Sequence, residues 1–164
     1  MNWPRLRNEV TQWLLKGTAT ACLLGVILLT DSACHKPQAG PPADFPFAYA
    51  QPDCAPNDAV ALDFYFTARK SECGKYSEPF IKISIWRNLP KSVPYSMNVS
   101  GHDGAAVRCL RPAACETATS GSLHLGKFID GNSSTGEYEL HFKDGSVEKG
   151  RFNATWCYVK FICG

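Results

Sequence analysis

The most regular feature of the chain is an alternation of apolar and polar side chains that begins near residue 60. The apolar positions are Val60, Leu62, Phe64 and Phe66, then Ile81, Ile83 and Ile85, then Leu123 and Leu125, then Tyr138, Leu140 and Phe142. A period of two residues places one face of a strand against a core and leaves the other face toward solvent. The pattern therefore predicts an antiparallel all-β domain in which each of these stretches is a half-buried strand.

The sequence after the last of these stretches predicts a tight hairpin. Asp144-Gly145 is the dipeptide preferred in two-residue type I′ turns, and such a turn would pair Phe142 with Val147, both facing inward. The apolar side chains farther along are Phe152, Ala154 and Trp156. They are one residue out of phase with Val147, and a shift of one residue indicates a β-bulge, which we place at Gly150.

Turn-forming sequences separate the predicted strands at residues 87–90, 101–104 and 130–132. Short strands spaced in this way indicate an antiparallel β-sandwich, immunoglobulin-like or related, or a small barrel. Residues 57–164 are long enough for a single domain of this kind with one modest core.

The first 33 residues have a different pattern, with basic residues followed by an apolar run. Arg5, Arg7 and Lys16 precede the uncharged residues 17–30. As a helix this run would rise about 21 Å, whereas a bilayer core is about 30 Å thick. The pattern predicts a signal peptide over residues 1–33 rather than a membrane-spanning helix.

The end of this segment, Ser32-Ala33-Cys34, resembles the box that directs lipid attachment in bacterial lipoproteins. The resemblance covers residues 1 to about 35 and implies cleavage before Cys34 and acylation of Cys34. With His35 after the cysteine, it also implies an outer-membrane location facing the periplasm. Asp31 stands where such boxes usually carry Leu or another uncharged residue, so soluble export and an uncleaved anchor stay open as alternatives.

Residues 34–56 predict a tether between the lipid and the domain. The prolines in this stretch are Pro37, Pro41, Pro42, Pro46, Pro52 and Pro56. Closely spaced prolines favour an extended, semi-rigid chain. The whole chain carries 17 Lys and Arg against 15 Asp and Glu, with no basic stripe, which argues against nucleic acid as a partner.

Six cysteines fall within or just before the predicted domain. They are Cys54, Cys73, Cys109, Cys115, Cys157 and Cys163. An even number in an exported domain predicts three disulfides. Cys109 and Cys115 can close a tight loop, whereas residues 157–163 are expected to form a strand about 20 Å long, too long for a bond between its ends. We therefore expect Cys109–Cys115, and expect Cys157 and Cys163 to pair with Cys54 and Cys73.

Metal and cofactor sites are not predicted. The chain has no Cys-x-x-Cys pair, and its histidines do not stand at ligand spacing from cysteines. His124 and His141 are expected to face solvent on strands. Glu137 and Glu139 share an outward face opposite Lys149 and Arg151, which indicates cross-strand ion pairs.

No catalytic motif is present: the chain lacks a Gly-x-Ser-x-Gly elbow, a phosphate loop and a His-Glu-x-x-His sequence. Ser100, His102 and Asp103 share a loop flanked by glycines, so a small exported hydrolase stays open as one alternative. A polar turn explains the three residues better, because Ser, Asp and Gly are common turn formers.

We therefore expect a non-enzymatic envelope lipoprotein, anchored in the bilayer through Cys34, that acts as a binding or structural module for a protein or cell-wall partner. The loops 87–95 and 101–106 are the candidate contact regions, and Trp86, Tyr95 and His102 are the candidate partner contacts. An inhibitor or immunity protein that neutralises a periplasmic enzyme is the alternative within the same class.

Overall fold

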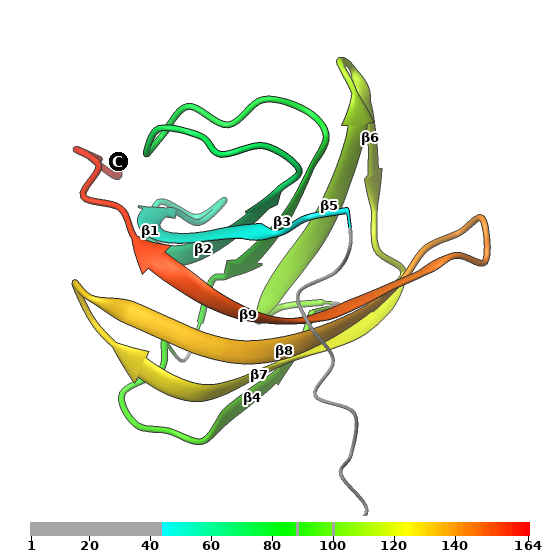
Figure 1. The fold of residues 1–164 in the computed structure, drawn as a ribbon. Coiled ribbons are helices and arrows are strands. Elements are labelled where there is room, and N and C mark those ends of the chain that lie inside the picture. Colours follow the sequence, from blue (N-terminus) through cyan, green and yellow to red (C-terminus); the bar gives the residue numbers. More distant parts are fainter. Residues whose placement is uncertain (1–43, 88, 100) are drawn as a thin grey trace, which may run out of the picture. The chain divides into compact units, whose positions relative to one another are not determined.

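The computed structural model describes residues 44–87, 89–99 and 101–164 and contains nine β-strands (Figure 1). The strands are β1 (Phe47–Cys54), β2 (Val60–Thr67), β3 (Phe80–Ile85), β4 (Tyr95–Asn98), β5 (Gly104–Arg111), β6 (Ala114–Thr117), β7 (Ser120–Ile129), β8 (Ser133–His141) and β9 (Val147–Trp156). The predicted signal peptide and Cys34 lie outside the described residues. Within the described residues, no helix has the length and apolar character needed to cross a membrane.

The nine strands form a single sheet in the order β4-β7-β8-β9-β1-β2-β3-β5-β6, which curls into a half-barrel (Figure 1). All neighbours are antiparallel except β1 and β9, which run parallel and pair at only two positions, Tyr49 with Thr155 and Ala50 with Trp156. The prediction of an all-β domain is confirmed. The two packed sheets of a sandwich are not confirmed, because one continuous sheet curls to enclose the core.

The apolar side chains of the predicted strands fill the inside of this curl. Those with at most 1% of their surface exposed include Phe64, Phe66, Ile81, Ile83, Ile85, Leu123, Leu125 and Leu140. Aromatic rings from strands that are far apart in the sheet order meet there. The ring centroids of Phe66 in β2 and Tyr138 in β8 are 4.6 Å apart, and those of Phe64 in β2 and Phe152 in β9 are 5.5 Å apart. These contacts confirm the inward faces expected from the alternation except at Val60, which is 50% exposed at the start of β2.

The sheet begins earlier in the chain than the predicted boundary at residue 57. β1 lies within the stretch expected to be a tether, yet it pairs with β2 along its whole length, from Phe47 opposite Thr67 to Cys54 opposite Val60. Pro52 has no backbone N–H to donate, but β9 pairs with β1 only as far as Ala50, so no donor is needed on that side.

The hairpin between β8 and β9 differs from the predicted two-residue turn. His141, rather than Phe142, stands opposite Val147. The N–H of Phe142 donates to the carbonyl of Ser146 at 3.0 Å, so the loop itself contains three residues, 143–145. Gly145 has a φ of 82° and its N–H donates to the carbonyl of Phe142 at 3.0 Å, which is the geometry of a type I turn followed by a left-handed glycine. Val147 consequently faces outward and is 46% exposed, so its predicted inward position is wrong.

The predicted β-bulge at Gly150 is also wrong, because the β8–β9 register runs without a shift from one end to the other. The bulge lies instead in β7, where the register with β8 shifts between Leu125 and Lys127. Gly126 is the additional residue. It changes the phase of β7, so that Leu125 before it and Phe128 after it both pack against the core.

Arg108 of β5 joins the two sides of the curl. Its side chain is 6% exposed and reaches the β8–β9 hairpin, which belongs to a distant part of the sheet order. One terminal nitrogen donates to Ser146 Oγ at 2.8 Å and to Glu148 Oε1 at 3.1 Å, and the other donates to Glu116 Oε2 at 2.9 Å and to Asp144 Oδ2 at 3.0 Å. This cluster ties β5 and β6 to the hairpin.

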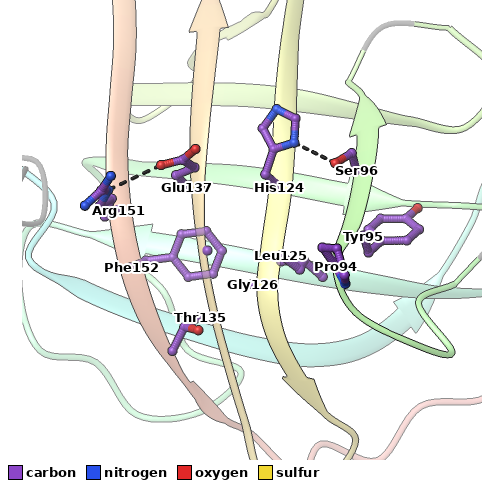
Figure 2. Close-up of a pocket in the computed structure, with 11 residues that line it drawn as sticks. Pro94, Tyr95, Ser96, His124, Leu125, Gly126, Thr135, Glu137, Arg151 and Phe152 are labelled. Atoms are coloured by element: carbon purple, nitrogen blue, oxygen red, sulfur yellow. Dashed lines mark hydrogen bonds and ion pairs between the residues drawn. The ribbon is translucent and has the colours of Figure 1, made fainter. Parts of the chain in front are cut away.

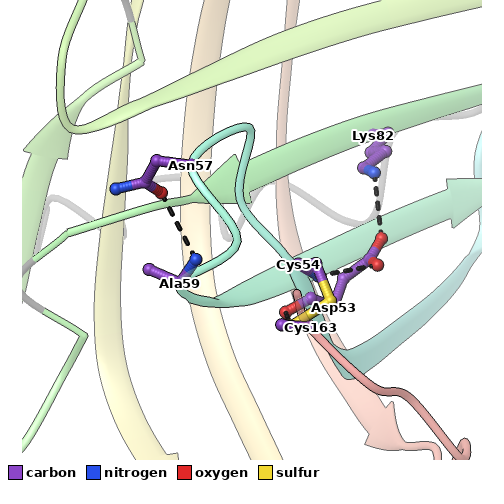
Figure 3. Close-up of a disulfide and its surroundings, with 6 residues drawn as sticks. All are labelled: Asp53, Cys54, Asn57, Ala59, Lys82 and Cys163. Atoms are coloured by element: carbon purple, nitrogen blue, oxygen red, sulfur yellow. Dashed lines mark hydrogen bonds and ion pairs between the residues drawn. A yellow bond between two sulfur atoms is a disulfide. The ribbon is translucent and has the colours of Figure 1, made fainter.

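Three disulfides connect all six cysteines of the domain. They are Cys54–Cys163, Cys73–Cys157 and Cys109–Cys115. The number of disulfides, the local pair and the pairing of the two C-terminal cysteines with the two N-terminal ones agree with the sequence prediction. Residues 157–164, expected to contain a strand, have no strand structure, and the first disulfide holds their end against the end of β1 (Figure 3).

Candidate functional site

The main candidate site is an apolar cavity at the point where β1 and β9 separate. After Trp156, the N–H of Cys157 donates to the carbonyl of Ala50 at 2.7 Å and the chain then leaves the sheet, while β1 continues to Cys54. The separation leaves an opening of about 670 Å³, which we call the apolar mouth. Its lining residues are Pro52, Val60, Ala61, Leu62, Leu89, Pro90, Lys91, Phe128, Asp130, Trp156 and Phe161.

Aromatic and aliphatic side chains that continue the core line the inner part of the apolar mouth. The rings of Phe128 and Trp156 meet edge to face, with centroids 6.3 Å apart. Both side chains are half-buried and pack against the core, as does Leu89 from the loop between β3 and β4. The cavity is therefore an access route to the apolar interior, bounded by side chains that core packing holds in place.

The rim of the apolar mouth carries large apolar side chains that face solvent. Val60 is 50% exposed and Phe161 is 38% exposed. Ile129 at 42% and Ile162 at 81% adjoin lining residues in the chain, and Tyr158, also at 81%, lies two residues after Trp156. The Tyr158 hydroxyl donates to the carbonyl of Gly131 in the β7–β8 turn. A concentration of exposed apolar surface of this kind is typical of an interaction site.

The charges at the rim are mixed in sign. Lys91 and Asp130 line the cavity, Lys160 adjoins the lining residue Phe161 in the chain, and Asp58 lies two residues before the lining residue Val60. These four residues comprise two cations and two anions, so the rim has no basic ring.

A second depression of about 510 Å³, lined by both polar and apolar side chains, lies over strands β4, β7, β8 and β9 (Figure 2). Four side chains stand next to one another across these strands, in the register Ser96, His124, Glu137, Arg151. Ser96 Oγ lies 2.6 Å from His124 Nδ1, and Arg151 Nε donates to Glu137 Oε2 at 3.3 Å (Figure 2). We call these four residues the polar row.

The polar row is a set of cross-strand pairs on the outer face. A serine beside a histidine is the start of a nucleophile–base arrangement, but catalysis also needs a donor for the developing negative charge. Adjacent strands lie about 4.8 Å apart, so Arg151, three strands away, is about 14 Å from Ser96. The ion pair between Glu137 and Arg151 confirms one expected pairing, whereas Glu139 instead contacts His141 Nε2 at 3.0 Å.

The three candidate contacts from the sequence lie away from the apolar mouth. Trp86 is half-buried, and its backbone N–H donates to the backbone carbonyl of Asp103 at 2.8 Å. Tyr95 is half-buried against the core, and burial, with the nearby Asp103 charge, raises its pKa. His102 is exposed in the loop between β4 and β5. Ser100, the third member of the hypothetical hydrolase site, lies outside the described residues.

The sequence pointed to the loop 87–95, which contributes Leu89, Pro90 and Lys91 to the apolar mouth, but not to the other lining residues, which come from four further segments of the chain. The one available signal was the run of Tyr158, Phe161 and Ile162 between two cysteines, which places apolar side chains in a segment too constrained to enter the core. Comparison of the chain with protein-family models, curated proteins and solved structures finds no match. The function is therefore argued from the geometry of the site.

Proposed function

We propose that the protein is a non-enzymatic binding module of the bacterial cell envelope whose apolar mouth receives an apolar side chain of a protein partner. The observation that carries this proposal is the mouth itself, a cavity of about 670 Å³ that reaches Trp156 and Phe128 through a rim of exposed apolar side chains. Binding energy at protein interfaces is concentrated where a large side chain of one partner fills a desolvated pocket of the other.

The disulfides support this proposal because they fix the rim before a partner arrives. Cys54–Cys163 holds the end of the chain beside Phe161, and Cys73–Cys157 holds the residue that follows Trp156. A preorganised rim loses little conformational entropy on binding, which favours affinity.

The mixed charge of the rim favours a protein over a lipid surface as the occupant. Apolar surfaces that insert into anionic membranes are usually flanked by Lys and Arg, whereas this rim has equal numbers of acids and lysines.

One observation favours the narrower hypothesis of an inhibitor or immunity protein. Residues 158–162 stand between Cys157 and Cys163, each of which forms a disulfide with a cysteine elsewhere in the domain. Tyr158 and Ile162 are the most exposed of the large apolar side chains, at 81% each. A short protruding segment braced at both ends can enter the cleft of an enzyme without first becoming ordered.

The proposal is tested with peptides displayed on phage as a random 12-residue library, selected against the full-length protein in detergent. The affinities of selected peptides are then measured for the wild type and for Val60→Asp, Phe161→Asp and Val147→Asp. Val147 is a matched control, because it is 46% exposed against 50% for Val60 but lies in the distant β8–β9 hairpin.

We expect peptides with a central aromatic or leucine residue, and at least a tenfold loss of affinity for Val60→Asp and Phe161→Asp with no change for Val147→Asp. Selection of no peptide, or equal binding to all four proteins, would contradict the proposal.

A further inference from the structure

A charged cluster lies on the outer face of the sheet, where solvent was expected. Lys82 Nζ of β3 is 2.6 Å from Asp63 Oδ2 of β2 and 3.3 Å from Asp53 Oδ2 of β1, and Figure 3 shows the second of these contacts. Ser84 stands opposite Asp63 in the register of β2 and β3. The alternation of β2 predicts that Asp63 faces water, yet it is 1% exposed.

The cover over this face is the segment of residues 68–79 between β2 and β3. Tyr76 of this segment stacks on Tyr65, with ring centroids 4.1 Å apart and planes at 23°. The Tyr76 hydroxyl donates to Gln51 Oε1 at 2.8 Å, and Gln51 stands opposite Asp63 in the register of β1 and β2. The two stacked rings and this hydrogen bond therefore hold the segment over the strands that carry Asp63.

The two carboxyl groups and one ammonium of the cluster have a charge balance that depends on pH. Burial, and the hydrogen bond to Asp53, raise the pKa of Asp63 to about 7. The same hydrogen bond lowers the pKa of Asp53. Burial acts to lower the pKa of Lys82, but the charge and hydrogen bonding of Asp63, together with Tyr65 and Asp53, raise it overall. Burial also raises the pKa of Tyr65 and of Tyr76, so both rings stay neutral. The cluster is neutral with one proton on the carboxyl pair and carries one net negative charge without it.

The covering segment is linked to the apolar mouth by a covalent bond. Cys73, within the segment, is bonded to Cys157, and the Tyr76 hydroxyl lies 3.5 Å from the sulfur of Cys157. Cys157 directly follows Trp156, which lines the mouth. A displacement of the segment therefore acts on the residue next to the wall of the mouth.

We propose that Asp53, Asp63 and Lys82 form a pH-sensitive latch, closed by a shared proton, that holds residues 68–79 against the sheet and thereby sets the shape of the apolar mouth. Loss of the proton leaves an uncompensated charge beneath two aromatic rings, and opening of the segment hydrates that charge. The consequence for the mouth rests on the proposed function, whereas the latch itself does not.

The expected size of the effect follows from proton linkage. If Asp63 regains an ordinary aspartate pKa when the segment opens, the opening equilibrium constant rises roughly tenfold between pH 6 and pH 8. Removing the titrating group with Asp63→Asn, which keeps the shape and the neutral state, abolishes this rise.

The test is amide hydrogen exchange of the full-length protein in detergent at pH 6 and pH 8, corrected for the intrinsic pH dependence of exchange, together with an NMR titration of the Asp63 carboxyl carbon. Asp58→Asn is the matched control, because Asp58 is an exposed carboxylate in the β1–β2 turn and asparagine tolerates its positive φ of 59°.

We expect Asp63 to titrate near pH 7, and protection of residues 68–79 to fall about tenfold at pH 8 in the wild type and in Asp58→Asn but not in Asp63→Asn. Titration of Asp63 near pH 4, or protection that does not change with pH in the wild type, would overturn the latch. These readouts need no partner, so a failed latch and a failed peptide selection are separate results.

Discussion

Replacement of Arg108 by methionine is the most informative single change to the fold. Methionine fills a similar volume without charge, so Arg108→Met removes the four hydrogen bonds to the β8–β9 hairpin and to β6 while keeping the space occupied. The guanidinium also lies over the Phe142 ring, 4.1 Å from its centroid, and methionine retains part of that contact.

The size of the effect depends on how well the partners of Arg108 can be rehydrated. Breaking a fully buried ion pair costs about 3–5 kcal/mol. Here the arginine is 6% exposed, but Glu116 and Glu148 are 36% and 23% exposed and can recover part of their hydration. We therefore expect Arg108→Met to lower the free energy of unfolding by about 2–3 kcal/mol.

The assay is equilibrium unfolding in urea, followed by tryptophan fluorescence, with Arg151→Met as the matched control. Arg151 makes one ion pair, with Glu137, in which the side chains are 45% and 54% exposed, so its loss should cost less than about 1 kcal/mol. Arg108→Lys should fall between the wild type and Arg108→Met, because an ammonium cannot reach acceptors on several segments at once.

Equal losses for Arg108→Met and Arg151→Met would refute the reasoning, since the two arginines would then contribute alike despite their different burial. A decrease in the free energy of unfolding of less than about 1 kcal/mol for Arg108→Met would also contradict the prediction, because that is the range expected for an exposed ion pair.

Two further predictions concern the disulfides and the buried aspartate. Replacing both cysteines of Cys54–Cys163 with serine should lower the free energy of unfolding by about 5 kcal/mol, and the same change at Cys109–Cys115 should lower it by about 2 kcal/mol. The first bond joins residues 109 positions apart and the second joins residues 6 positions apart, so the first restricts the unfolded chain more. Thermal or urea unfolding measures both losses, and equal losses would contradict this ordering. Since the pKa of Asp63 is higher in the folded state, its contribution to stability is complete below about pH 4 and declines as the pH rises toward 7. The free energy of unfolding of the wild type should therefore fall relative to that of Asp63→Asn as the pH rises over this interval. A difference that stays constant from pH 4 to pH 8 would contradict the raised pKa of Asp63.

The strands that could be predicted are those whose side chains alternate without interruption. β3 is the clearest example, because Ile81, Ile83 and Ile85 are all fully buried and their period of two is a property of the strand itself. The number of disulfides was predictable for a similar reason, since it follows from composition and parity alone.

The elements that could not be predicted depend on contacts between distant parts of the chain. β1 contains Pro52 and has no clear alternation, and it is a strand because β2 pairs with it along its whole length. The position of the bulge depends on such contacts too. The local sequence indicated Gly150, whereas the bulge lies at Gly126, where it lets Phe128 pack against the core.

Buried polar residues were the other obstacle. In β9, the inward position expected for Val147 is taken by Glu148, because Arg108 supplies a cation on the inside of the curl. Asp63 is buried on the outer face because the segment of residues 68–79 covers it. In each case the residue that makes burial possible is distant in the sequence, so a local pattern does not contain it.

The most direct test of the proposed binding function is to locate a selected peptide on the protein by NMR. We expect the peptide to shift the indole N–H resonance of Trp156 and the amide resonances of Phe161 and Ile162, while the amide resonances of His124 and Arg151 in the polar row stay unchanged. A peptide that shifts the polar row and leaves the Trp156 indole unaffected would contradict it.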